Sequence, residues 1–268
     1  MIVTLLTDFG TADYFVGALK GALLDANAGA QVVDITHEIP PHDIEAGAFT
    51  LLAAFETFPA GTVHVAVVDP GVGSSRRPIA VASPRHIFVG PDNGIFGYVY
   101  ERVRPFRVFH LTDESYFRKS TSATFHGRDI FAPVAGALAR GVRAEELGLE
   151  VEDFVRLPFA VPVRQPDGTL VGAIIHIDRF GNCITNITPR DFPQEAFGPR
   201  VCIRIGEHEV SSFRRFFADA PDDETAGTPF AIWGSAGLLE LAVFRDSAAR
   251  VLGAKRGQSV ELKTAAES

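Results

Sequence analysis

The residues best suited to chemistry lie where an apolar segment ends in a glycine-rich turn. Residues 63–68 form a nearly continuous apolar run, which is typical of a strand buried on both faces of a parallel sheet. Asp69 follows this run, and a turn with Gly71 and Gly73 leads from it to Arg76. Ligands of open α/β sheets bind beyond the carboxyl ends of the strands, so Asp69 is a candidate site residue. The spacing also allows Arg76 to fold back onto Asp69 as an ion pair, an arrangement that is often only structural.

A second carboxylate follows the first predicted strand. Asp8 lies in the segment Thr7-Asp8-Phe9-Gly10, where an acidic side chain can accept hydrogen bonds from a ribose diol, as acids do in dinucleotide folds. Asp13 or Thr11 can instead cap the helix that comes next, but Asp8 is harder to explain as a cap.

A histidine precedes a predicted helix in the segment Phe125-His126-Gly127-Arg128-Asp129. An imidazole titrates near neutrality, so His126 can exchange a proton or hold a water beside the positive helix terminus. The alternative is a loop histidine next to an Asp129 that only complements the helix dipole. Three further histidines are interpreted as non-catalytic: His37, His42 and His64.

The segment from Asp178 to Ile187 carries a possible base-recognition turn. Phe180 and Asn182 flank a glycine, and an aromatic face with a two-sided amide can stack on and hydrogen-bond an adenine. The alternative interpretation is an ordinary β-turn with a buried aromatic ring.

Composition limits the classes of partner and compartment. The chain has 268 residues and a formal net charge of -8, which argues against a nucleic-acid partner and is compatible with a cationic small ligand. The apolar start has no basic flank and meets Asp8 too soon for a signal peptide, and no run reaches transmembrane length. Cys183 and Cys202 lie in β-like segments and are expected to be free thiols. We therefore expect a cytoplasmic protein without a membrane partner.

The sequence favours no metal site. Zinc sites have closely spaced histidine or cysteine ligands, and no such spacing occurs here. A carboxylate-rich magnesium site formed by Asp8, Asp69 and His126 stays open as an alternative. There is no Walker loop, nucleophile elbow or dinucleotide fingerprint.

Periodicity predicts two domains, at residues 1–157 and 158–268. The first alternates strands and helices and is expected to be an α/β sandwich with a largely parallel sheet. Its predicted strands are residues 2–6, 31–35, 63–68, 78–81, 86–89 and 106–111, and its helices are residues 14–24, 44–55, 95–103 and 131–138. The second consists of short β-like runs and is expected to be all-β, as a small barrel or sandwich. Its predicted strands are residues 170–177, 183–187, 201–205, 230–233 and 238–243.

Five motifs in order resemble the S-adenosyl-L-methionine hydroxide adenosyltransferase family, the hydrolytic relatives of fluorinase and chlorinase. The motifs are T-D-F-G, V-V-D-P-G-V-G-x-x-R, F-H-G-R-D, I-D-x-F-G-N-x-x-T-N-I and G-S-x-G-x-L-E-L-A-V, and they extend over nearly the whole chain. The resemblance implies an N-terminal α/β sandwich, a C-terminal β-barrel, a homotrimer with sites between subunits, and hydrolysis of S-adenosyl-L-methionine to adenosine and L-methionine. It implies no cofactor, since S-adenosyl-L-methionine is the substrate.

The resemblance also implies a role for each matching residue. Asp69, Arg76 and His126 take the catalytic positions. The substrate-binding positions are Asp8 for the ribose diol, Asp13 for the methionine ammonium, Phe180, Asn182 and Phe217 for adenine, Ser235 for methionine, and the backbone near Arg245 for adenine. The chain departs from the family pattern at Gly234-Ser235 and at Asp246-Ser247.

Three other activities are weighed against the hydrolase. The halogenating branch has a tyrosine at the position of Asp69, and an anionic Asp69 repels halide, so the resemblance favours the hydrolytic branch. The other two alternatives are a protein that senses S-adenosyl-L-methionine or adenosine with negligible turnover, and a metal-dependent nucleotide hydrolase.

Overall fold

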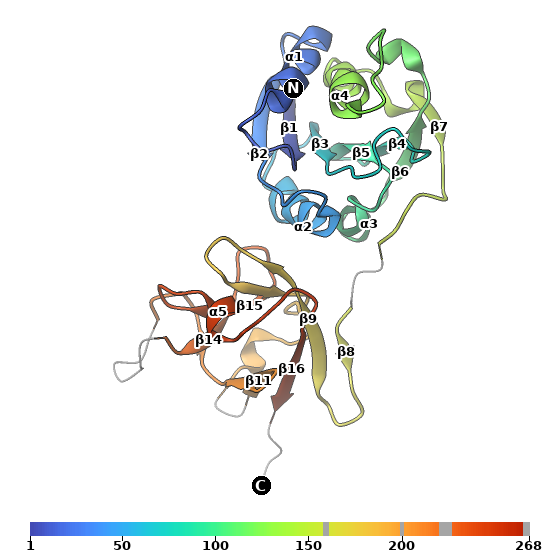
Figure 1. Cartoon of the computed structure of the whole chain (residues 1–268). Coiled ribbons are helices and arrows are strands. Elements are labelled where there is room, and N and C mark those ends of the chain that lie inside the picture. The colour runs from blue at the N-terminus through green and yellow to red at the C-terminus, as the bar shows by residue number, and fades with distance from the viewer. Residues whose placement is uncertain (158–160, 199–200, 220–226, 265–268) are drawn as a thin grey trace. The chain divides into compact units, whose positions relative to one another are not determined.

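The chain divides into two compact units, Met1–Phe159 and Ala160–Ser268. The computed structural model describes residues 1–157, 161–198, 201–219 and 227–264 (Figure 1). The predicted domain border after residue 157 adjoins residues 158–160, which lie outside the described residues.

A seven-stranded sheet forms the centre of the first unit. Its order is β2 (Gln31–Thr36), β1 (Ile2–Thr7), β3 (Thr62–Val67), β5 (His86–Pro91), β4 (Pro78–Ala82), β6 (Arg107–Leu111) and β7 (Gly148–Glu150). The pairings from β2 to β5 are parallel, whereas those from β5 to β7 are antiparallel. The expectation of a largely parallel sheet is therefore right for only half of the pairings. The connection between β4 and β5, residues 83–85, is too short for the crossover that parallel strands need.

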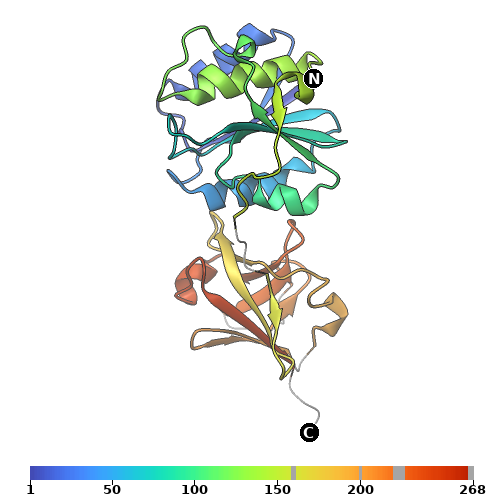
Figure 2. The same cartoon turned by 90° about the vertical axis from the view of Figure 1, so that its right-hand side faces the viewer.

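Helices cover both faces of this sheet (Figure 2). The helix α1 (Phe15–Ala26) packs with α4 (Ala132–Ala139) on one face, and α2 (Ile44–Phe55) packs with α3 (Gly97–Arg102) on the other. Shorter helical turns are η1 (Glu114–Tyr116), η3 (Ala144–Glu146) and the π-helical η2 (Gly127–Phe131). None of the described helices is long and apolar enough to cross a membrane.

The continuous apolar run of β3 follows from this double cover. Val63, Val65 and Val67 belong to the core beneath α1 and α4, whereas Ala66 and Val68 belong to the core beneath α2 and α3. Since successive side chains of a strand point to opposite faces, both sets must be apolar.

The second unit is a curled sheet with little helix. Its order is β12 (His208–Val210), β11 (Val201–Ile205), β16 (Ser259–Thr264), β9 (Leu170–Ile177), β10 (Cys183–Thr185), β15 (Leu239–Val243), β14 (Pro229–Trp233) and β13 (Phe213–Arg214), with β8 (Val163–Arg164) also paired to β9. Within the described ranges these pairings do not close the sheet into a barrel. The unit also contains α5 (Ala248–Val251) and the turn η4 (Gln194–Ala196), so it is mainly rather than entirely β.

A histidine is buried inside the first sheet. His64 is completely buried, with its Nδ1 2.7 Å from Thr4 Oγ1 and its Nε2 3.3 Å from His86 Nδ1. The rings of Phe55 and Phe88 pack against the imidazole. Burial, and then the charge of His86, lowers the pKa of His64 to about 3. The folded protein therefore holds this imidazole in its neutral form.

We predict that His64 makes the first unit acid-sensitive. The imidazole titrates near 6.5 when unfolded and about 3 when folded, so between these values only the unfolded state binds the proton, and stability falls as the pH falls. The expected loss from this group is roughly 2 kcal/mol at about pH 5. Urea unfolding of wild type and His64→Asn at neutral and acidic pH measures it. An equal pH dependence in the two proteins would contradict the prediction.

Candidate functional site

The turn after β3 forms the predicted ion pair. Arg76 Nε donates to Asp69 Oδ1 at 3.0 Å, and Arg76 Nη2 donates to Asp69 Oδ2 at 2.5 Å. The backbone N–H groups of Val72 and Ser74 donate to the carbonyls of Asp69 and Gly71, so consecutive turns return the chain to the carboxylate. The side chains of Arg76 and Asp69 are only 9% and 5% exposed, so this two-pronged contact is largely shielded from water.

Arg76 also joins this pair to His126. Its Nη2 donates to His126 Nδ1 at 2.7 Å, so a neutral His126 carries its proton on Nε2. Burial, and then the charge of Arg76, lowers the pKa of His126. Arg76 Nη1 is buried, and no hydrogen-bond partner for it occurs among the described residues. The guanidinium therefore bridges a carboxylate and a neutral imidazole and keeps one donor free.

Gly73 lets the two loops that carry these groups approach each other. Its φ is +77°, and a Cβ at this position would lie 2.2 Å from the carbonyl oxygen of Ala123. A side chain here would be strained in backbone conformation and would also push the turn away from the loop before His126.

Asp129 fixes the segment around His126. Its carboxylate is completely buried and accepts from Arg128 Nε at 2.7 Å and from the backbone N–H of Ser122 at 2.8 Å. Burial by itself would raise the pKa of Asp129, but these hydrogen bonds prevail and lower it. Asp129 thus holds the loop before His126 in place. The sequence alone had suggested only that Asp129 complements the helix dipole.

A cavity of about 290 Å³ brings three of the predicted residues together. Asp8, Asp69 and His126 line it, with aromatic walls that include Phe9 and Phe125. Asp13 is exposed and is not among the residues that line this cavity.

His42 is a cavity residue that the sequence interpretation missed. It lines the same cavity, its backbone N–H donates to Asp8 Oδ2 at 2.9 Å, and its φ is +68°. A left-handed backbone is uncommon at a residue other than glycine and often marks a functional site. The only signal in the sequence is its place between Pro41 and Asp43, the residue that caps α2.

His37 is buried and contacts residues on both sides of Asp8. It is 4% exposed, its Nδ1 lies 2.8 Å from Thr7 Oγ1, and its carbonyl accepts from Gly10 N–H at 2.7 Å. Because these contacts lie on either side of Asp8 in the chain, His37 positions the Asp8 loop. The sequence had indicated only that His37 is not catalytic.

The second unit contains the predicted Phe180 turn. Asp178 accepts from the backbone N–H groups of Phe180 and Asn182 at 2.9 and 2.8 Å and from Asn182 Nδ2 at 2.9 Å. Gly181 has a φ of +83°, and a Cβ there would lie 2.1 Å from Ser247 Oγ. Phe180 is 77% exposed, which excludes the alternative of a buried aromatic ring and leaves a face free for stacking.

The other predicted binding residues of the second unit are exposed. Phe217 packs edge-on against the buried Phe230, with ring centroids 6.1 Å apart. Ser235 is exposed, and so is Arg245, whose φ is +57°. The structure thus leaves all three side chains accessible.

Glu240 is a second residue that the sequence interpretation missed. It is 7% exposed, and burial, then the charge of Asp178, raises its pKa to about 7. A Cβ on Gly234 would overlap the Glu240 carboxylate, at 1.7 Å from Oε1. The glycine that departs from the family pattern therefore makes room for this acid.

Across the described part of the chain, no group of three or more histidine, cysteine, aspartate and glutamate side chains is arranged to hold a metal ion.

Comparison with known proteins gives matches over both units. The family models described as SAM hydroxide adenosyltransferase N-terminal and C-terminal domains match residues 3–148 and 172–261. An (R)-S-adenosyl-L-methionine hydrolase from Thermus thermophilus is 41% identical, covering 97% of this chain and 98% of the relative. A fluorinase from Actinoplanes is 28% identical, covering 90% of each chain. The crystal structure of an uncharacterized conserved protein from Thermotoga maritima matches with a TM-score of 0.88 at 34% identity, covering 98% of this chain and all of the other.

We predict that Gly73→Ala destabilises the protein by roughly 2–4 kcal/mol, because left-handed strain adds to the overlap with Ala123. Gly61→Ala is the matched control: Gly61 has a φ of +88°, but a Cβ there would meet no atom within 4 Å. The control should lose only about 1 kcal/mol, from strain alone. Chemical unfolding of the three proteins checks this, and equal losses would show that the contact with Ala123 is unimportant.

Proposed function

This chain belongs to the SAM hydroxide adenosyltransferase family, and on that premise we propose that it hydrolyses S-adenosyl-L-methionine to adenosine and L-methionine. The observation that carries the proposal is the hydrogen-bonded chain Asp69–Arg76–His126 beside a cavity that also contains Asp8.

The chemistry needs a strong nucleophile more than an acid. Water attacks C5′ of the ribose as the C5′–S bond breaks, and the bonding electron pair goes to sulfur. Methionine leaves as a neutral thioether and one proton is released. Because the sulfonium is already a good leaving group, the protein must mainly activate water and align it with the breaking bond. The proposed reaction uses no cofactor.

The geometry supports a division of labour among three residues. Asp69 orients the water and accepts its proton, since each carboxylate oxygen keeps a lone pair beyond its bond to Arg76. Arg76 stabilises the developing hydroxide, and its unpartnered Nη1 is a donor available for this role. His126 donates a hydrogen bond from Nε2 and so completes the set around the water, because its Nδ1 accepts from Arg76. The proton taken by Asp69 is released to solvent when the products leave.

Substrate contacts follow the positions implied by the family. Asp8 holds the ribose diol, and its place in the cavity with Asp69 supports this role. Asp13 meets the methionine ammonium. Adenine is recognised by Phe180, Asn182, Phe217 and the backbone near Arg245, and methionine by Ser235.

The residue at position 69 favours hydrolysis over halogenation. A negative carboxylate at Asp69 repels halide and attracts the protons of water. The higher identity to the hydrolase from Thermus thermophilus than to the fluorinase from Actinoplanes agrees with this choice.

We further propose a cytoplasmic homotrimer in which the substrate lies between the first unit of one subunit and the second unit of its neighbour. The free thiols of Cys183 and Cys202 suit a reducing compartment. The division of the proposed substrate contacts between two compact units supports a shared site.

We expect purified, metal-stripped protein to convert S-adenosyl-L-methionine to equal amounts of adenosine and methionine. Chromatography of the reaction mixture measures both products. Asp69→Asn and His126→Ala should each lower kcat by roughly 100-fold to 10,000-fold, because proton transfer and the alignment of water are lost.

Asp153→Asn is the matched control, since this exposed carboxylate pairs with Arg77 outside the cavity. It should retain wild-type turnover. Binding without turnover would indicate a sensor, activity only after addition of magnesium or zinc would indicate a metal-dependent hydrolase, and near wild-type activity in both site variants would refute the catalytic roles.

Subunit mixing tests the shared site. Asp69→Asn and Phe180→Ala chains, each nearly inactive at low substrate concentration, are co-expressed with different tags and purified as mixed assemblies. If each site takes one unit from each of two chains, about a quarter of the sites in a random mixture carry neither substitution and activity returns to that level. No recovery, or a fully active monomer, would contradict the proposed assembly.

A further inference from the structure

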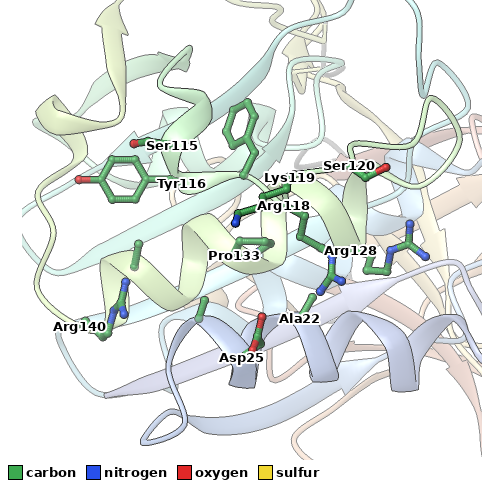
Figure 3. Close-up of a pocket in the computed structure, with 13 residues that line it drawn as sticks. Ala22, Asp25, Ser115, Tyr116, Arg118, Lys119, Ser120, Arg128, Pro133 and Arg140 are labelled. Carbon is green, nitrogen blue, oxygen red and sulfur yellow. The ribbon is translucent and has the colours of Figure 1, made fainter.

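A groove of about 660 Å³ lies on the first unit, outside the residues of the catalytic cavity. It is bounded by α1, α4 and the segment around residues 115–120, as Figure 3 shows. Four of its lining side chains are cationic: Arg118, Lys119, Arg128 and Arg140. The proposed hydrolysis uses none of them.

The groove carries more positive charge than its own acids neutralise. Asp25 is the one carboxylate among the described residues that line it, and Asp129, which is completely buried, lies behind it. Asp129 accepts from Arg128 at 2.7 Å and lies 3.6 Å from Arg118, so two guanidinium groups share one carboxylate. Four cations therefore face two carboxylates, in a chain whose overall charge is -8. A local positive excess in an acidic protein favours an anionic ligand.

The lining groups match phosphate chemistry. Arginine presents a planar set of N–H donors that fits phosphate oxygens, and lysine adds a mobile point charge. Hydroxyl groups for further hydrogen bonds come from Ser115, Tyr116 and Ser120. Ala22, Pro133 and Ala137 line the groove with apolar surface, against which the organic part of a ligand can pack. The volume exceeds what a lone phosphate fills and falls in the range of small-molecule sites.

From this combination we propose that the groove binds a small phosphate ester of nucleotide size. The phosphates lie among Arg118, Lys119 and Arg128. Figure 3 shows Arg118 and Arg128 toward one end of the groove and Arg140 toward the other, and the organic part extends over the apolar surface toward Arg140. The site is separate from the proposed substrate site, although consecutive residues line the two cavities: His126 and Gly127 the catalytic one, Arg128 the groove.

Cytidine 5′-diphosphate is a suitable probe, because it carries the phosphates without the adenine that the proposed substrate site recognises. Calorimetric titration of the whole protein should show binding that weakens as salt rises, whereas cytidine should not bind. Arg118→Ala combined with Lys119→Ala should weaken binding roughly 10-fold or more, because two charge-assisted contacts to the phosphates are lost. Both side chains are exposed, so the double variant is expected to fold.

The matched control is Arg143→Ala combined with Arg204→Ala, which removes the same charge from exposed positions outside the groove. It should keep wild-type affinity for the probe. The proposal is overturned if wild type does not bind cytidine 5′-diphosphate, if cytidine binds equally well, or if both double variants lose affinity equally. Because the readout is binding, the result does not depend on whether the protein hydrolyses S-adenosyl-L-methionine.

Discussion

The site depends on one guanidinium group that is shared between two loops. Arg76 donates to Asp69 within its own turn and to His126, fifty residues further along the chain. Charge-assisted bonds of this kind are strong and directional when water is largely excluded. They fix the carboxylate and the imidazole relative to each other, and the cation also contributes to the lowered pKa of His126. Without Arg76, the two groups would lose the contact that joins them, and only burial, the larger of the two causes, would still lower the pKa of His126.

The scaffold determines which residues can reach this guanidinium. Parallel pairing of β1 with β3 places Thr7 opposite Val67, so Asp8 and Asp69 emerge at the same edge of the sheet. The antiparallel strands β4, β6 and β7 enlarge the sheet and carry none of the proposed catalytic groups. Only the parallel half, with helices over both faces, brings two strand ends and the start of η2 to one cavity.

Local signals predicted much of the site. The apolar run, the glycine turn and the arginine after it were sufficient to predict the pair of Asp69 with Arg76, because few residues separate the two groups. The direction of β4 and the cavity role of His42 were not predicted. The direction of β4 follows from the short connection between β4 and β5, and from a strand order that the sequence does not show. The cavity role of His42 follows from its left-handed backbone, a conformation that the sequence indicates clearly only at glycine.

The sequence by itself determined the family, the two-part organisation of its patterns and the identity of the chemical groups, because motifs and periodicity are local properties of a chain. Only the tertiary structure decided which groups meet: that Arg76 reaches His126, that Gly73 permits this by contact with Ala123, and that His37 supports the Asp8 loop. Those contacts join residues that are distant in the chain, and their geometry is set by packing, which no single segment encodes.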